Sequence, residues 1–298
     1  MPAPVLEVSA VTKKFGAFAA VEDVSFTVGQ GSVCALLGTN GAGNTTLLKC
    51  IIGLIPPDEG SIRCPARAGF ARQDWFSYVP EESGLYERMR VEETILYFAQ
   101  LSGMAKGDAR RAMEPWLEKL KLAPKRRSRI HELSKGNQQK VKLISALINH
   151  PPLLILDEPF TGLDGEGSAL LRESLVQIRK EGTTILLSSH RLDQMDLLAD
   201  HVVVLAAGRK ILDSTLSEAR RLYRQNLIEV SFTSAPPSLD GLPGVADLRW
   251  EEGVAQLTLG PGANPKEILT TLLARGCEVE NFMRHSPDLS EIFHAVTR

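Results

Sequence analysis

The chain has 298 residues, which is enough for one large domain with a small one or for two of medium size. Its 43% hydrophobic and 23% charged residues are typical of a soluble globular protein. The formal net charge of -2 supplies no basic field for nucleic acid, and no apolar run approaches the ~18–20 residues that span a bilayer. We therefore expect no nucleic-acid partner, and we expect any membrane component to be a separate chain.

The amino terminus and the cysteines favour a cytoplasmic protein. The opening residues, MPAPVLEVSAVTKK, lack the charged start and apolar core of a signal peptide. The cysteines show no CxxC spacing and no nearby histidine pair: Cys34, Cys50, Cys64 and Cys277. This pattern favours reduced cysteines that pack in the interior over disulfides or a metal site.

The amino-terminal part begins with strands of alternating polarity and continues into a buried strand. The predicted elements are strands at Val5–Val11 and Val21–Val28 around a loop at Lys13–Ala20, a turn at Gly29–Ser32, a buried strand at Val33–Leu37, a helix at Thr45–Ile52 and a turn at Pro56–Gly60. A Gly-rich loop joins the buried strand to the helix.

The middle of the chain is helical and then alternates. Charged and apolar residues mix at helical spacing over Val91–His150. After it come, in order, a strand at Leu153–Leu156, a helix at Glu166–Lys180, a strand at Thr183–Ser189, a helix at Leu192–Leu198, a strand at His201–Leu205 and a hairpin turn at Ala207–Arg209. Alternation of this kind predicts a parallel sheet with helices on its faces.

A domain boundary is predicted near Tyr223–Leu227. Beyond it we expect a strand at Leu227–Phe232, a hairpin at Glu251–Gly253, a helix at Pro265–Arg275, a strand at Cys277–Met283 and a helix at Leu289–Val296. This order predicts a small α+β unit at 227–298, separate from a larger domain at 1–222 whose helical part covers about 85–150.

Residues Gly38–Thr46, GTNGAGNTT, lie between a buried strand and a helix. Their glycines have the spacing of a Walker A loop, in which backbone N–H groups and a helix N-terminus bind phosphate. Thr45 stands where a hydroxyl ligates Mg²⁺. The lysine of that motif is replaced by Asn44, and on the glycines alone an ordinary tight turn is the alternative.

An acid pair follows the apolar run at Leu153–Leu156. Such a strand delivers both carboxylates at its carboxyl edge, where sheets of this type bind ligands. Asp157 is placed to hold the Mg²⁺ shell and Glu158 to orient or deprotonate a water. An isolated acid pair is often only a solvated turn, but here it precedes Pro159 and Thr161–Asp164.

Two further motifs stand at helix and strand ends. Leu133–Lys140, LSKGNQQK, begins a helix, with Ser134 as a good N-cap and Gly136 allowing close approach. It is either a plain helix start or a second anion site. His190 follows an apolar strand at the same sheet edge as Glu158, which makes it a candidate sensor of the γ-phosphate.

These motifs, in this order, resemble the nucleotide-binding domain of ABC transporters over about Val5–Leu222. The resemblance implies a P-loop NTPase core with a parallel sheet, an antiparallel β subdomain and a helical subdomain, and it identifies Phe15 as the adenine-stacking residue of the A-loop. It implies that ATP and Mg²⁺ are bound, that Glu158 and His190 are catalytic, and that Thr45 and Asp157 hold the metal. The ATP-binding residues it implies are Phe15, Gly38, Asn40, Gly41, Ala42, Gly43, Asn44, Thr45, Thr46, Glu81, Ser134 and Gly136.

The resemblance also implies partners. Two such domains meet head to tail, so that Ser134 and Gly136 of one copy close over nucleotide on the other, as a homodimer or a heterodimer. A separate transmembrane permease subunit is expected, with this chain on the inner face of the cell membrane. The segment Tyr78–Tyr86, with Glu81 at the Q-loop position, the form of the signature helix and the tail at Pro287–Phe293 resemble an efflux-type subfamily and favour export.

Asn44 bears on hydrolysis more than on nucleotide binding. Losing a preorganised donor of this kind costs about 3–4 kcal/mol, or roughly 10²–10³ in rate. Lys49, one turn further along the helix, is expected to face away. Three explanations stay open: a binding-only or slow site, an asymmetric pair with an intact subunit, or a single-base change made or read into an ordinary enzyme. We expect Mg·ATP binding with reduced turnover, and a nucleotide-gated regulatory subunit is the alternative function.

Overall fold

The computed structural model describes residues 4–65, 75–82, 84–223, 227–251 and 253–297. It divides into two compact units, Met1–Leu216 with Val296–Arg298, and Ser217–Ala295. Within the described ranges, no helix has both the length and the apolar character that crossing a membrane requires. All four cysteines are buried, as expected for residues that pack in the interior.

The core of the first unit is a six-stranded sheet with the order β5-β6-β7-β3-β8-β9. Its strands are β3 (Val33–Gly38), β5 (Ser77–Val79), β6 (Leu153–Asp157), β7 (Thr184–Ser188), β8 (His201–Ala206) and β9 (Arg209–Thr215). The first five strands in this order run parallel, and β9 turns back antiparallel to β8. β6 and β7 are buried at every position, because helices cover parallel sheets on both faces. The predicted parallel sheet is confirmed.

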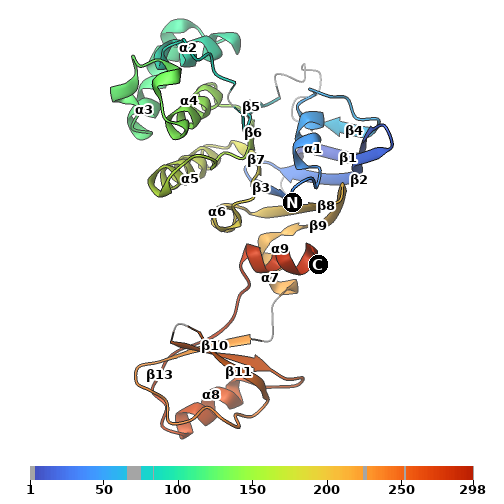
Figure 1. The fold of residues 1–298 in the computed structure, drawn as a ribbon, viewed down its shortest axis with the longest axis vertical. Coiled ribbons are helices and arrows are strands. Elements are labelled where there is room, and N and C mark those ends of the chain that lie inside the picture. Colours follow the sequence, from blue (N-terminus) through green and yellow to red (C-terminus); the bar gives the residue numbers. More distant parts are fainter. Residues whose placement is uncertain (1–3, 66–74, 83, 224–226, 252, 298) are drawn as a thin grey trace. The chain divides into compact units, whose positions relative to one another are not determined.

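A three-stranded antiparallel sheet with the order β2-β1-β4 forms the second layer (Figure 1). Its strands are β1 (Pro4–Phe15), β2 (Phe18–Gly29) and β4 (Glu59–Arg63). The helix α1 (Asn44–Ile51) buries Leu47 and Leu48 in one apolar cluster with side chains of both sheets. The loop expected at Lys13–Ala20 is much shorter than predicted, because both strands continue to a tight turn at Gly16.

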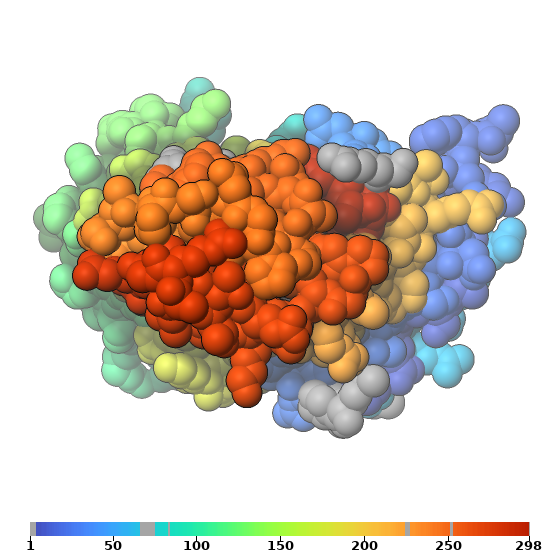
Figure 2. Space-filling view, turned by 90° about the horizontal axis from the view of Figure 1, so that it is seen from below, coloured from blue at the N-terminus to red at the C-terminus, as the bar shows by residue number. Residues whose placement is uncertain are grey.

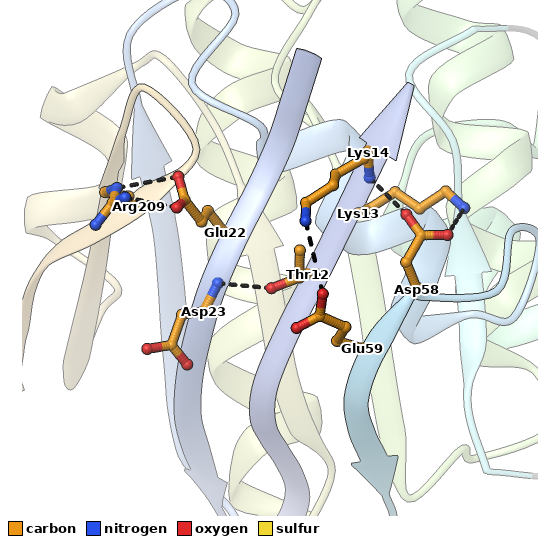
Figure 3. A network of polar contacts seen from close by, with 8 residues as sticks. All are labelled: Thr12, Lys13, Lys14, Glu22, Asp23, Asp58, Glu59 and Arg209. Atoms are coloured by element: carbon orange, nitrogen blue, oxygen red, sulfur yellow. Dashed lines mark hydrogen bonds and ion pairs between the residues drawn. The ribbon is translucent and has the colours of Figure 1, made fainter. Parts of the chain in front are cut away.

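Polar contacts explain why these strands continue (Figure 3). The carboxylate of Asp58 accepts hydrogen bonds from the Lys13 ammonium at 2.9 Å and from the backbone N–H of Lys14 at 2.6 Å. On the other side, Arg209 of β9 forms a two-pronged ion pair with Glu22 of β2, at 2.5 and 3.1 Å. These contacts hold the antiparallel sheet in place near the end of β1, where Phe15 lies.

The helical stretch expected at Val91–His150 consists of several elements, seen beside the sheet in Figure 1. These are α2 (Val91–Leu101), α3 (Lys106–Lys119), two short 3₁₀ turns at Ala123–Lys125 and Ile130–Glu132, and α4 (Lys135–Leu147). Two more helices, α5 (Gly165–Lys180) and α6 (Leu192–Asp196), lie between the later strands of the sheet in sequence.

The second unit contains a four-stranded antiparallel sheet with the order β11-β12-β10-β13. Its elements are β10 (Leu227–Phe232), β11 (Val245–Glu251), β12 (Val254–Leu259), α8 (Pro265–Ala274) and β13 (Val279–Arg284), with α7 (Leu216–Leu222) before them and α9 (Leu289–Thr297) after them. Ile268 and Leu272 of α8 pack on the sheet side chains Ile228 and Val230. Side chains of this unit, orange to red, form a continuous surface in Figure 2.

This α+β composition agrees with the sequence prediction for 227–298. Parts of two expectations lie outside the described residues: Glu252 of the expected hairpin turn, and residues 224–226 of the expected boundary. Ser83, within the expected Q-loop segment, also lies outside them.

Candidate nucleotide-binding and catalytic site

The Gly-rich loop, the acid pair and His190 lie together at the carboxyl edge of the main sheet. β3, β7 and β6 are parallel neighbours, and Ser188 pairs with both Leu36 and Asp157. Because the three strands end together, the Gly-rich loop after β3, the acid pair after β6 and His190 after β7 leave the sheet side by side. This is the edge at which parallel α/β sheets bind ligands.

The loop over 38–43 takes the left-handed backbone conformation, which favours glycine, at two points. Gly41 and Gly43 have φ angles of 79° and 106°. A Cβ on Gly43 would lie 2.3 Å from the carbonyl oxygen of Ala20 in β2, which leaves no room for any side chain. The loop closes on itself through a 2.9 Å hydrogen bond from the Ala42 N–H to the Thr39 carbonyl, and α1 starts directly after it.

The side chain of Asn44 folds back over the start of this loop. A Cβ on Gly38 would lie 2.9 Å from its Oδ1 and 3.0 Å from its Nδ2. Oδ1 is buried and has no hydrogen-bond partner. A buried polar atom without a partner is unusual and costs about 1–3 kcal/mol, so the Asn44 amide is not fully satisfied within the loop. Lys49, as expected, is exposed.

The turn between β8 and β9 supports the loop from behind, which the sequence did not indicate. The N–H of Gly208 donates to the Ala42 carbonyl at 3.1 Å, and its carbonyl accepts from the Glu22 N–H at 2.8 Å. Gly208 has a φ of 79°, and a Cβ there would lie 3.1 Å from the carbonyl oxygens of Ala19 and Ala20. The turn therefore needs glycine for close approach as well as for its conformation.

Asp157 ends β6 with its side chain almost fully buried. Ser188 of β7 donates to its Oδ1 at 2.5 Å, and the Tyr78 hydroxyl of β5 lies 3.4 Å from its Oδ2. Burial and the Asp157 charge raise the pKa of Tyr78, so the phenol stays protonated and can donate. Strands on both sides of β6 therefore fix the orientation of this carboxylate.

Glu158 has a φ of 48°, in the left-handed region that costs most side chains about 1–3 kcal/mol. The turn aims its carboxylate across to β7, where Ser189 donates to Oε2 at 3.1 Å and His190 Nδ1 lies 2.9 Å from it. Burial raises the pKa of Glu158, and the hydrogen bond from His190 partly opposes that rise. A carboxylate with a raised pKa beside a histidine is suited to proton transfer.

The signature residues lie elsewhere on the same unit. Ser134 caps α4, accepting from the Asn137 N–H at 3.3 Å, which confirms the predicted N-cap. A Cβ on Gly136 would lie 3.0 Å from the carbonyl oxygen of Gly162, so the helix start packs on the loop after β6. Among the described residues, no hydrogen bond joins Ser134 or Gly136 to the loop at 38–46.

Phe15 and Glu81 stand at two exposed positions. Phe15 ends β1 with 54% of its surface exposed, and the Lys13 ammonium lies 5.8 Å from the centre of its ring. Glu81 follows β5, and its backbone carbonyl accepts a 3.0 Å hydrogen bond from Lys142 of α4. Lys142 is a buried lysine that the motif pattern does not single out.

The residues present fit ATP and Mg²⁺. The loop leaves no room for a side chain at Gly38 or Gly43, and the amide of Asn44, whose Oδ1 has no hydrogen-bond partner, lies beside Gly38. Because an amide exchanges its oxygen and nitrogen by a half-turn, the same position can present an N–H donor to a phosphate. The exposed Thr45 begins the helix after the cradle, and Asp157 ends a neighbouring strand, so an oxygen donor set suited to Mg²⁺ is available.

A glycine cradle before a helix, with an acid pair and a histidine on adjacent parallel strands, defines a P-loop nucleotide-binding protein. A family model described as ABC transporter matches residues 21–161, and one for the C-terminal domain of DrrA1-3-like ATP-binding proteins matches residues 215–297. The chain belongs to the ABC transporter ATP-binding proteins. Domains of this family are generally ATPases that bind ATP with Mg²⁺, and the subunits work with separate membrane permeases.

Individual relatives agree with this assignment. The ABC transporter ATP-binding protein YhaQ of Bacillus subtilis is 34% identical over 291 residues, with 97% of each chain covered. The Nod factor export ATP-binding protein I of Burkholderia lata is 38% identical, over 72% of this chain and 71% of its own length. A solved ATP-binding subunit of an ABC transporter superposes with a TM-score of 0.68 at 34% identity, over 74% of this chain and 93% of that one.

Replacing Glu158 by glutamine tests the charge at the end of β6. Because its folded pKa is raised, ionisation opposes folding, so Glu158 favours the folded state at low pH and loses that contribution as pH rises through the raised pKa. Glu158→Gln is therefore expected to be more stable than the natural protein at neutral pH, with the difference vanishing below pH ~4. Urea unfolding across this pH range measures it. The same substitution at exposed Glu173 is the control, and an unchanged pH profile at Glu158 contradicts the assignment.

Replacing Gly208 by alanine tests the support of the phosphate loop. The added Cβ meets the carbonyls of Ala19 and Ala20 and displaces the turn from Ala42. We expect Mg·ATP affinity to fall roughly tenfold, which corresponds to about 1.4 kcal/mol, as measured by titration with a fluorescent ATP analogue. Gly182→Ala is the control, since Gly182 also has a positive φ but open space around it. Equal affinities in the two variants contradict the role of Gly208.

Proposed function

We propose that this chain is the ATP-hydrolysing subunit of an exporter, at the inner face of the cell membrane, and that Asn44 slows its turnover. The observation that carries the proposal is the 2.9 Å contact between Glu158 and His190, at the sheet edge from which the phosphate loop also leaves. A binding-only protein has no need of a strained, desolvated carboxylate paired with a histidine. The exporter assignment is supported by the export relative of Burkholderia lata and by the DrrA-like match at the carboxyl terminus.

The residues divide the chemistry among them. The N–H groups of the 38–43 loop and of the first turn of α1 hold the phosphates, while Thr45 and Asp157 provide oxygens for the metal. Mg²⁺ supplies charge neutralisation at the transferring phosphoryl group when it is bound. Glu158 orients the attacking water and accepts its proton, and His190 keeps that carboxylate in place while its own exposed ring can contact the γ-phosphate.

Asn44 weakens this arrangement at one point. Its amide is shorter than a lysine and carries no charge, so it can donate to a phosphate without offsetting the charge that develops there. The remaining cradle, Thr45 and Phe15 are intact, and so we infer that ATP binding is less affected than hydrolysis. The relatives reported above give no support to a purely regulatory subunit.

We further propose that the working unit is a head-to-tail dimer, with the same chain or with a second ATP-binding subunit. Ser134 is exposed at the start of α4, and Gly136 packs on the loop after β6 rather than on the phosphate loop. Both are therefore free to close on nucleotide that another copy holds. A bacterial ABC transporter cassette with a TM-score of 0.64, at 20% identity over 71% of this chain and 98% of its own length, was solved as a dimer and shows the same fold.

The permease is proposed to dock in a groove of about 850 Å³ next to Glu81. Pro80 and Tyr78 line one side of the groove, and Phe98 and Leu101 of α2 line another. Leu101 is 65% exposed. A groove with both apolar and polar lining residues suits a helix of the membrane subunit, and movement there can reach Asp157 through Tyr78, which lines the groove and whose hydroxyl lies 3.4 Å from the Asp157 carboxylate.

Restoring the lysine tests the enzymatic part of the proposal. Asn44→Lys is expected to raise the rate of ATP hydrolysis by roughly 10²–10³, because it adds a charged donor at the phosphate cradle. Phosphate release under saturating Mg·ATP measures the rate. Adding Glu158→Gln to Asn44→Lys should abolish the gain. Equal rates for the natural chain and Asn44→Lys contradict the proposed effect of Asn44.

A surface charge tests the permease groove. We expect Leu101→Asp to stop the chain from co-purifying with its membrane permease, because burying a carboxylate in a protein contact is strongly disfavoured. Leu273→Asp is the matched control, since Leu273 is also exposed but lies in the second unit. Retention of Leu101→Asp at the natural level is evidence against docking in this groove.

A further inference from the structure

Lys142 is a charged residue in an unusual setting. It lies on α4 with only 8% of its surface exposed. Its ammonium donates to the backbone carbonyls of Pro80 at 2.9 Å and Glu81 at 3.0 Å, and it lies 3.5 Å from the carbonyl of Glu82. Three consecutive carbonyls therefore converge on one buried charge.

Burying an ammonium is expensive unless its donors are satisfied, so this contact has to be specific. Burial lowers the pKa of Lys142, while the nearby charge of Glu81 raises it. Carbonyl dipoles stabilise the charged form without neutralising it. An apolar residue of the same length would fill the space at a lower desolvation cost. The role of Lys142 is therefore to make these hydrogen bonds.

The segment that Lys142 holds leads directly to the catalytic edge. Residues 80–82 follow β5, which pairs with β6 so that Val79 lies opposite Leu156. One residue before Val79, the Tyr78 hydroxyl lies 3.4 Å from the Asp157 carboxylate. A shift of the backbone at 80–82 is therefore passed to Asp157 through a strand of only three residues.

The other end of the connection is the signature helix. α4 begins at its cap Ser134, and Lys142 lies eight positions further on (142 − 134), or about 12 Å along the axis. A helix transmits displacement with little bending over so short a distance. Ser134 and the carbonyls at 80–82 are thus attached to one rigid element.

We propose that Lys142 is a positioning residue that ties the segment 80–82 to the signature helix, so that both move together when Mg·ATP binds. This inference rests on the proposed function in requiring that the chain binds nucleotide and that Ser134 closes on nucleotide held by a second copy. Its consequence is that contact by Ser134 with nucleotide on a second copy is communicated to the permease groove, which Lys142 also lines. Removing the ammonium leaves each part folded and separates their movements.

The first test measures hydrolysis in the Asn44→Lys background, where turnover is high enough to resolve. Lys142→Met, which keeps the length and removes the donors, is expected to lower kcat about tenfold through misplacement of the catalytic edge. KM for ATP should stay within about twofold, since the phosphate loop and Phe15 are untouched. Lys142→Arg keeps the donors and should restore most of kcat, and Lys180→Met, at an exposed lysine, should change neither constant.

The second test uses the natural chain and needs no turnover. Amide exchange is followed with and without Mg·ATP in peptides covering residues 77–90 and 133–147. In the natural chain both peptides should change protection together, and in Lys142→Met the change in the first should be lost while that in the second remains. Chemical unfolding of each variant measures any loss of stability.

The outcomes distinguish the proposed enzymatic function from the proposed positioning role of Lys142. If Asn44→Lys hydrolyses no ATP, the proposed enzymatic function fails, and the exchange measurement still decides the role of Lys142. Coupled exchange in Lys142→Met, or a kcat equal to that of its parent, overturns the positioning role. Equal losses in Lys142→Arg and Lys142→Met, accompanied by lower stability, also overturn it, because they show that the lysine only maintains the fold.

Discussion

The backbone of Gly43 lies against the carbonyl of Ala20 with no space for a side chain between them. This contact joins the phosphate loop to β2, and the Gly208 turn holds the same loop through Ala42. Two sheets and the turn between β8 and β9 therefore meet at one short stretch of backbone. The position of the cradle relative to Asp157, Glu158 and the exposed Phe15 depends on that packing more than on any side chain within the cradle.

The fold was largely predictable because its signals are local. Apolar runs ending in Asp157 or His190 identify buried strands, and their alternation with helices indicates a parallel sheet. The end of β1 was not predictable from such signals. Lys13 and Lys14 look like loop residues, and they remain in the strand because Asp58, more than forty positions later, accepts their hydrogen bonds.

The candidate site likewise has residues that the sequence predicts and residues that it does not. The motif residues could be found because each kind of chemistry requires a particular residue at a particular spacing. Gly208 and Lys142 could not, because each acts on backbone carbonyl or amide groups that any residue possesses. Any residue type can supply the backbone group, so the partner's side chain does not reveal the contact. Lys142 is also separated from Pro80 by 62 positions. Signals of this type become visible only in three dimensions.

Asn44 is a local departure within an otherwise consistent site. The strands around it still bring the Gly-rich loop, the acid pair and His190 to one edge of the sheet. The Oδ1 of Asn44 is buried without a hydrogen-bond partner, which is unusual for a polar atom in a folded protein.

The left-handed turn at Glu158 has a consequence for anyone who engineers this protein. Glycine relieves the strain at that φ, and any neutral residue removes the buried charge. A screen that rewards heat resistance alone is therefore biased toward replacing the carboxylate that we propose as the proton acceptor. Libraries made for thermostability need this codon held constant, and sequences improved without that restriction should be checked here first.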